Sequence, residues 1–302
     1  KESKVSLGDG VELQDSGQVI ALKDGVIIFT DGRKIDVDTS YVHDKHVDLR
    51  SGSLNMEGSL QVRGDVRGVL HVKATGNLEI KGGMDRGSAS AGGDLRVSGG
   101  VKGGEHSNLF AEGNMLVHHA ERATLLSGGL LRVEAIANCK LVARTIEVSG
   151  RMRGGEATCE KSMIIQEAGA PSGTDTRLTA GVMFERPASD VSRVVQNQRG
   201  GRPGSRLQGR SRLQGRSRLR APGSVRSVRS RGELDAETAR KNLERATQKI
   251  ELEKNAVIHV RGMAYPGVTV QIGSHKTVID EPMENVRFRL EADEIVTERL
   301  AG

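Results

Sequence analysis

A short phrase of alternating apolar residues recurs seven times from residue 59 onward and limits the folds open to this chain. Each copy has an apolar residue, any residue and then Val or Ile, and most copies follow a small or polar residue, as in Gly93-Asp94-Leu95-Arg96-Val97. The leading apolar residues are Leu60, Leu78, Leu95, Met115, Leu131, Ile146 and Met163. They are 18, 17, 20, 16, 15 and 17 residues apart, which is too irregular for a six-residue repeat.

This alternation predicts short strands with one buried and one solvent face, because successive side chains of a strand point to opposite sides. A repeat of about 17 residues is too short for a βαβ unit and is typical of a parallel β-solenoid, whose coils stack about 4.8 Å apart. The alternative is a mixed sheet with many hairpins. The expected core rows are Leu60, Val62, Leu78, Ile80, Leu95, Val97, Met115, Val117, Leu131, Val133, Ile146 and Val148.

The composition agrees with a narrow core filled by stacked aliphatic side chains. The chain has 302 residues but only two Tyr, four Phe and no Trp, so aromatic rings cannot supply the bulk of a core. It lacks an apolar run of about 18 residues, which argues against a membrane-spanning helix. Cys139 and Cys159 are expected to be free, buried and in a reducing compartment, because they form no CxxC pattern.

The segments around the repeat differ from it in pattern. Strand candidates with Asp-Gly turns predict a small β-meander in the N-terminal region, which we expect to be truncated. Ala236, Ala239, Leu243, Ala246 and Ile250 have the spacing of a coiled-coil seam. The expected organisation is an N-terminal β region (1–46), the solenoid (47–186), an Arg-rich flexible linker (187–232), an amphipathic helix (233–254) and strands that complete or cap the solenoid (255–302).

The linker contains the strongest charge feature of the chain. Between Val191 and Gly232 lie twelve Arg and no acidic residue, and without them the chain has 33 basic and 39 acidic residues. A tandem hexamer at 206–217 is too poor in apolar residues to fold, so residues 196–232 are expected to be disordered. Weak, salt-sensitive contact with nucleic acid or an anionic membrane is one hypothesis and a solvated linker is the other. The contact residues would be Arg206, Arg210, Arg212, Arg216, Arg218 and Arg220.

Motifs for catalysis, metal binding or cofactor binding are weak. His118-His119 is the only adjacent histidine pair, and we interpret it as a polar turn because no further ligand can be aligned with it. His43 and His46 lack the HExxH pattern, and Gly99–Gly104 lacks the GxxxxGK[ST] of a phosphate loop. The acidic residues form no repeated pair for sugar chemistry. We therefore predict no catalytic, metal or cofactor-binding residue, no cofactor, and no enzyme.

Several stretches, taken in order, resemble the bacterial flagellar assembly protein A family. They are Val47–Gly58 with Val62–Val66, Gly93–Val101, Arg153–Glu156 leading to Gly173–Leu178, and Val260–Gly262 with Tyr265–Val268. The resemblance implies a right-handed β-solenoid, a long helical hairpin inserted before the last strands in many members, and no assigned catalytic residues. It also implies a cytoplasmic bacterial protein linked to flagellar assembly or polar organisation. Residues 196–232 depart from the family where the first arm of the hairpin is expected.

These observations favour a non-enzymatic scaffold that binds protein partners of unknown identity, in the bacterial cytoplasm, at the cell pole or the inner membrane surface. Self-association through residues 234–254 is a further expectation. One alternative is a polymer-forming, bactofilin-like cytoskeletal solenoid, which requires uncapped ends. Another is an anionic-surface binder that acts through the Arg-rich linker.

Overall fold

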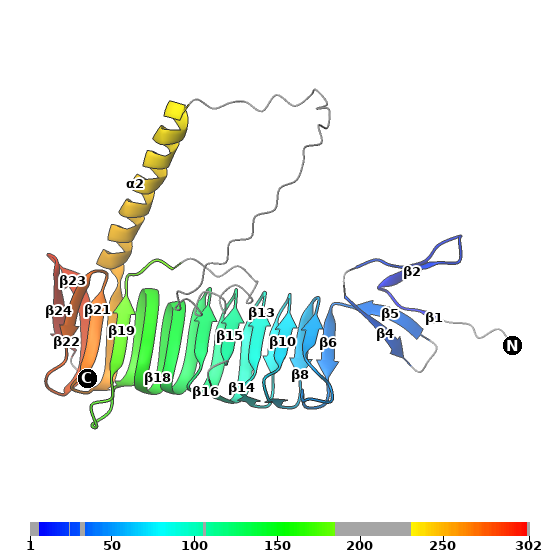
Figure 1. Cartoon of the computed structure of the whole chain (residues 1–302), viewed down its shortest axis with the longest axis horizontal. Helices are drawn as coiled ribbons and strands as arrows, with labels where there is room; N and C mark the ends of the chain where they lie inside the picture. The colour runs from blue at the N-terminus through cyan, green and yellow to red at the C-terminus, as the bar shows by residue number, and fades with distance from the viewer. Residues whose placement is uncertain (1–5, 24, 31–33, 105–106, 185–230, 301–302) are drawn as a thin grey trace, which may run out of the picture. The chain divides into compact units, whose positions relative to one another are not determined.

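A computed structural model of the chain describes residues 6–23, 25–30, 34–104, 107–184 and 231–300. The chain forms two compact units, one made of Lys1–Val191 with Lys249–Gly302 and the other of Ser192–Gln248. Most of the described residues belong to a stack of parallel strands in the first unit (Figure 1). The six predicted contact arginines of the linker lie outside the described residues.

Three rows of strands form the sides of the coils. The first row pairs in parallel and in register, so that Leu60, Leu78, Leu95, Met115 and Leu131 stack on one another. It contains β6 (Ser40–His43), β8 (Ser59–Val62), β11 (Leu78–Ile80), the first parts of β14 (Leu95–Lys102) and β16 (Met115–Glu121), β18 (Leu130–Ala168) and β20 (Val257–Ala264). The predicted parallel β-solenoid is therefore confirmed, with about eight turns, and the hairpin-rich mixed sheet is wrong.

The other two rows have shorter strands. One contains β9 (Val66–Arg67), β12 (Met84–Asp85) and the second parts of β14 and β16. The other contains β7 (Leu54–Met56), β10 (His71–Ala74), β13 (Ser88–Ala91), β15 (Asn108–Ala111) and β17 (Thr124–Ser127). Both rows continue into β18, which is extended over 39 residues and winds through several coils.

The core fills the space between the three rows. All twelve expected core residues are buried, with exposed fractions of 2% or less. Cys139 and Cys159 are free and buried, and burial raises the pKa of the Cys159 thiol to about 12. Backbone atoms of Cys139 lie beside Gly155, so the two cysteines do not occupy matching positions on neighbouring coils. Both thiols act as small apolar side chains.

Polar side chains at the turns connect successive coils. Asn77 Oδ1 accepts a hydrogen bond of 2.9 Å from the backbone N–H of Asp94, whose own Oδ1 accepts one of 2.7 Å from Asn114 N–H. Asn114 Oδ1 in turn accepts a 2.9 Å bond from Leu130 N–H. This ladder satisfies backbone donors that the turns would otherwise leave unpaired.

The N-terminal strands form two small sheets rather than one meander. Strands β2 (Val11–Leu13) and β3 (Val19–Ala21) make an antiparallel hairpin. Strands β4 (Val26–Thr30) and β5 (Lys34–Asp38) are antiparallel, but β1 (Ser6–Leu7) pairs in parallel with β5. The chain order of a meander is lost because β1 covers the free edge of β5.

The parallel stack ends in antiparallel strands near the C-terminus. After β19 (Thr176–Ala180) and β21 (Val268–Ile272), β22 (His275–Val278) folds back on β21. Strand β23 (Met283–Glu291) is antiparallel to β20, and β24 (Glu294–Arg299) is antiparallel to β23. The predicted C-terminal strands are confirmed.

Helix α2 (Arg231–Asn255) contains the predicted seam. Among its described side chains, Leu243 is 68% exposed and Ile250 is 54% exposed, so these two seam residues lie in solvent. No helix among the described residues is both long enough and apolar enough to cross a membrane.

Candidate functional site

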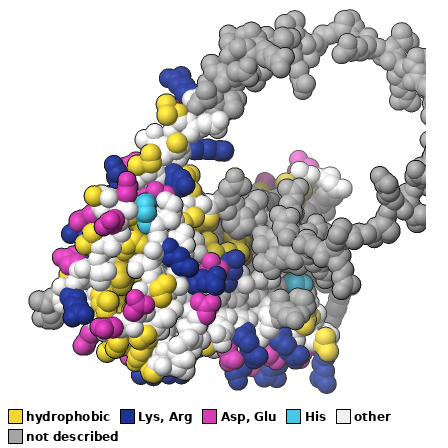
Figure 2. Space-filling model, turned by 60° about the vertical axis from the view of Figure 1, so that its left-hand side comes forward, with side chains coloured by type: hydrophobic (Ala, Val, Ile, Leu, Met, Phe, Trp, Pro, Cys, Tyr) yellow, Lys and Arg dark blue, Asp and Glu magenta, His cyan; other side chains and the backbone are white. Residues whose placement is uncertain are grey.

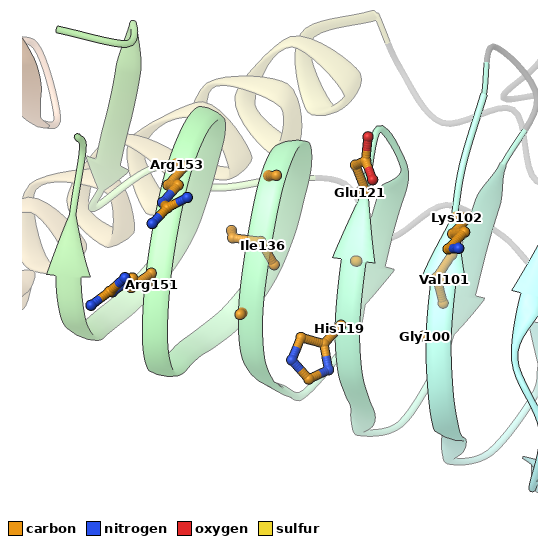
Figure 3. A pocket seen from close by; sticks show the side chains of 11 residues that line it. Gly100, Val101, Lys102, His119, Glu121, Ile136, Arg151 and Arg153 are labelled. Carbon is orange, nitrogen blue, oxygen red and sulfur yellow. The ribbon is translucent and has the colours of Figure 1, made fainter. Parts of the chain in front are cut away.

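A hollow of about 410 Å³ opens on one side of the solenoid where β14, β16 and β18 run next to one another (Figure 3). It is a surface depression that spans several coils. Its lining consists of Gly100, Val101, Lys102, His119, Ala120, Glu121, Ala135, Ile136, Ala137, Arg151 and Arg153.

The register of the strands explains why this side is hollow. His119 pairs with Ala135 of the next coil, and Glu121 pairs with Ala137. On the preceding coil, Gly100 lies opposite His119. The small side chains at these positions leave a gap between the coil of His119 and the coil of the two arginines, so the hollow follows from residue size in the stacked coils.

Positive charge dominates the walls. Lys102, Arg151 and Arg153 contribute three cations against the single carboxylate of Glu121. Arg151 Nε is 2.7 Å from Glu167 Oε2, and Glu121 Oε1 is 3.3 Å from Arg122 Nε. Among the described residues, Lys102 and Arg153 have no ion-pair partner, so these two cations are available to an anionic ligand.

The floor of the hollow is apolar. Gly100, Ala135 and Ala137 present its outward-facing apolar surface, whereas Val101, Ala120 and Ile136 point into the core beneath it and are no more than 4% exposed. The described lining offers no Ser, Thr or Cys nucleophile, and its two titratable groups besides the cations are His119 and Glu121. Cationic walls around an apolar floor suit a ligand that combines a carboxylate or phosphate with an apolar part.

Charged side chains also cover the neighbouring side of the coils. Figure 2 shows Lys and Arg intermingled with Asp and Glu and with apolar side chains on the face that it presents. Arg132 donates to Glu147 Oε2 through both Nε, at 2.9 Å, and Nη2, at 2.8 Å. A second hollow of about 240 Å³ lies here, and Arg96, Leu116, His118, Arg132 and Glu134 are among its lining residues. Arg132 and Glu147 thus pair across neighbouring coils.

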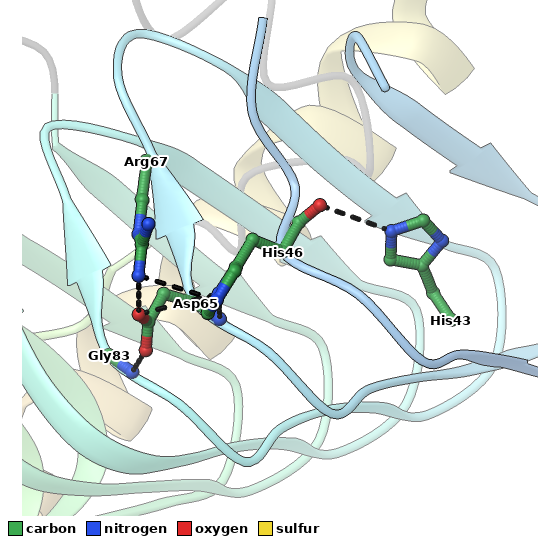
Figure 4. Close-up of polar contacts among 5 residues, drawn as sticks. All are labelled: His43, His46, Asp65, Arg67 and Gly83. Carbon is green, nitrogen blue, oxygen red and sulfur yellow. Dashed lines mark hydrogen bonds and ion pairs between the residues drawn. The ribbon is translucent and has the colours of Figure 1, made fainter. Parts of the chain in front are cut away.

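His43 and His46, which lack a metal-binding pattern in the sequence, contribute to a polar cluster at the first coils (Figure 4). His46 Nδ1 accepts a 2.9 Å hydrogen bond from the backbone N–H of Asp65 on the next coil. The Asp65 carboxylate accepts hydrogen bonds from Arg67 at 2.8 Å and from Gly83 N–H at 3.0 Å. These bonds, that from Arg67 first, lower the pKa of Asp65. The arrangement is structural, because it joins three successive coils.

The interpretation of His118 and His119 as a polar turn is wrong, because both residues lie on strand β16. The structure brings a third ligand-bearing side chain, Glu134, to this pair from the next coil. Alternation in the sequence could not reveal it, since both histidines and the glutamate point outward. The spacing carries the signal: His118 and Glu134 are 16 residues apart, as are the stacked Met115 and Leu131.

Comparisons with known proteins identify the family. The family model of the Flagellar Assembly Protein A beta solenoid domain matches residues 39–295. Comparisons with curated proteins and with solved structures gave no match. The matched range begins next to β6 and ends within β24, so it includes the parallel stack and the antiparallel strands β22 and β23. Since it covers most of the chain, this protein belongs to the flagellar assembly protein A β-solenoid family.

Proposed function

We propose that the chain is a non-enzymatic scaffold of bacterial flagellar assembly that holds an acidic segment of a partner protein in the hollow of Figure 3. The family relates the chain to flagellar assembly. The observation that carries the binding proposal is that Lys102 and Arg153, beside an apolar surface, have no ion-pair partner among the described residues. The protein would act in the cytoplasm, at the cell pole or the inner membrane surface.

The shape of the site supports binding rather than turnover. The depression is open and formed by regular strands, whereas an active site needs a nucleophile or an acid–base pair within reach of an enclosed substrate. Carboxylates of a partner would pair with Lys102 and Arg153, and apolar side chains between them would cover Gly100, Ala135 and Ala137. The coil stack would keep these groups at fixed positions.

The test combines crosslinking with complementation in the host bacterium. A photoreactive amino acid at Ala137, within the hollow, is compared with one at Val69, which is 56% exposed elsewhere on the solenoid. We expect a specific crosslinked partner from the first position only. The double variant Lys102→Glu/Arg153→Glu should lower this crosslink at least about tenfold, because it places like charges opposite an acidic segment.

The matched control is Lys73→Glu/Arg261→Glu, which makes the same change of net charge at two exposed cations outside the hollow. Cells that lack the gene should lose flagella, and the wild type and the control should restore them while the hollow variant does not. Normal flagella in the deleted strain would refute the flagellar role. Full crosslinking and complementation by the hollow variant would refute the binding site.

A second candidate function is self-association through α2. It is favoured by the exposure of Leu243 and Ile250, which lie one heptad apart on this helix. Leu243→Lys/Ile250→Lys should convert an assembled form into a smaller species in analytical ultracentrifugation. Identical sedimentation of the wild type and the variant would dismiss this candidate.

The polymer and anionic-surface alternatives have less support. End-to-end polymerisation requires open coils, whereas β23 and β24 end the parallel stack with antiparallel strands whose edge carries Glu294, Glu298 and Arg299. Discrete particles in electron microscopy would dispose of the polymer. Binding to nucleic acid or membranes through the Arg-rich linker concerns residues outside the described ranges, and deletion of 196–232 tests it directly.

A further inference from the structure

Three side chains that commonly bind transition metals converge at one corner of the solenoid. They are His118 and His119 on β16 and Glu134 on β18, and one ligand atom of each lies within 4.8 Å of the other two. His118 Nδ1 is 2.5 Å from Glu134 Oε2. The two imidazole rings have centroids 4.1 Å apart and planes at 89°. No other such group of three was found among the described residues.

A break in strand alternation puts both histidines on the outside. Val117 and Ala120 are buried, so the two residues between them face solvent consecutively. The pairing of β14 with β16 changes register at this point, between Val97 and Gly100, as in a β-bulge. A regular strand would have buried one of the two imidazoles.

The next coil supplies the Glu134 carboxylate and leaves open space beside the His119 imidazole. Glu134 follows Val133, the partner of Val117, and therefore lies beside His118. Ala135 is the partner of His119, and its methyl group leaves the space next to that imidazole open toward the hollow. His119 can therefore turn toward His118 and Glu134 without displacing a large side chain.

We propose that His118, His119 and Glu134 form a Zn²⁺-binding site. Two imidazole nitrogens and one carboxylate oxygen are a donor set that suits Zn²⁺, whereas Ca²⁺ and Mg²⁺ prefer oxygen ligands. Tetrahedral Zn²⁺ with bonds of about 2.1 Å places its ligand atoms about 3.4 Å apart. Side chains as exposed as His118 (51%) and Glu134 (52%) reach this spacing by rotation about their χ angles.

The site has three protein ligands and leaves a fourth position for water or for a donor from a bound partner. Because it lies at the edge of the hollow, where His119 belongs to the lining, a Zn²⁺ ion there adds positive charge to that side of the solenoid. The assignment of the metal rests on the donor set and does not depend on the proposed scaffold function.

The experiment measures metal binding to the full chain, stripped with a chelator and free of any affinity tag. Titration with ZnCl₂ by isothermal calorimetry should show one saturable site per chain, and Co²⁺ at the same site should give the visible absorption of a tetrahedral complex. Substitutions His118→Ala, His119→Ala and Glu134→Gln should each weaken Zn²⁺ binding at least about tenfold, since loss of even an outer-shell partner costs about 10–100-fold.

His71→Ala and Glu156→Gln serve as matched controls, because they remove an exposed imidazole and an exposed carboxylate elsewhere on the same solenoid. Both should bind Zn²⁺ like the wild type, and circular dichroism should confirm that all variants fold. The proposal is overturned if the wild type binds no Zn²⁺, or if the three site variants bind it as tightly as the two controls.

Discussion

The early and late coils of the solenoid share one kind of core but differ in the polar contacts that predominate between their coils. From β6 to β17 the strands are short and separated by turns, where Asn77, Asp94 and Asn114 accept hydrogen bonds from the backbone of the next coil. In β18 the chain stays extended through several coils (Figure 1).

The late coils are connected on the outside by ion pairs. Examples are Arg132–Glu147 at 2.8 Å, Arg144–Glu160 at 3.5 Å and Arg151–Glu167 at 2.7 Å. Such exposed pairs contribute little stability and weaken in salt, whereas a side-chain bond to a backbone N–H is less sensitive to salt. The core therefore sets stability in both halves, while the polar contacts between coils set how each half responds to salt.

The largest expected effects test whether the two halves share an equivalent core. Leu95 in the early coils and Leu141 in the late coils are 1% and 0% exposed. Leu95→Ala and Leu141→Ala should each lower the free energy of unfolding by about 2–5 kcal/mol, because each leaves a cavity in a packed row. Urea denaturation followed by circular dichroism measures both. A difference well beyond that range would break the equivalence.

A substitution in β18 tests how closely its coils approach one another. Gly155 has a φ of +89°, and a Cβ there would collide with the backbone oxygen of Cys139. Gly155→Ala should therefore cost about 2–3 kcal/mol, from backbone strain and the required shift of the neighbouring coil.

The control for this close approach is Gly173, which has a φ of +70° and open space, with no atom within 4 Å, where a Cβ would lie. Gly173→Ala should cost only about 1 kcal/mol, because backbone strain acts alone. Equal losses for the two variants in the same denaturation experiment would mean that contact between the coils is unimportant at Gly155.

A smaller effect distinguishes the two kinds of connection. Asn114→Ala removes the acceptor of the Leu130 N–H and should cost about 1 kcal/mol at both low and high NaCl. Glu147→Gln removes one partner of Arg132 and should cost at most about 1 kcal/mol, with the loss shrinking as salt rises. The same salt dependence in both variants would contradict the distinction.

The smallest expected effect is a pH-dependent change in Tm when Asp65 in the first coils is substituted. The pKa of Asp65 is lowered from its ordinary value of 3.8, mainly by the hydrogen bond from Arg67. Its stabilising contribution is thus present above that ordinary value and is lost as the pH falls through the lowered pKa of the folded state. Asp65→Asn should lower the Tm at pH 7, and the difference from the wild type should shrink toward pH 3. If the Tm difference between the two proteins grew on acidification, the stabilising contribution of ionised Asp65 would be contradicted.

Some features of the fold could be predicted from the sequence, and others could not. Leu78 and Ile80 could be placed in the core from sequence because burial follows from strand alternation, which is a local property. The strands at the C-terminal end of the stack could be predicted from sequence, but their antiparallel direction could not. That direction is set by the pairing of β23 with β20, which is a tertiary contact. The parallel pairing of β1 with β5 was missed for the same reason.

The candidate sites depended more on tertiary structure. The sequence supplied His118 and His119 but assigned them to a turn, and it gave no reason to join Lys102 with Arg153, which lie on coils that are not consecutive. Small residues such as Ala135 and Ala137 carry no functional signal of their own. Their effect, an open hollow, exists only beside the larger side chains of neighbouring coils.

By itself, the sequence determined that this chain stacks short strands around an aliphatic core. The reason is that each copy of the repeat has one apolar face, and stacking of the copies buries that face. The tertiary structure alone decided which outward side chains meet. Coil lengths vary, and a break in alternation between the buried Val117 and Ala120 leaves His118 and His119 both on the outside. Contacts between coils therefore depend on the sum of all the turns between two residues, which local patterns do not encode.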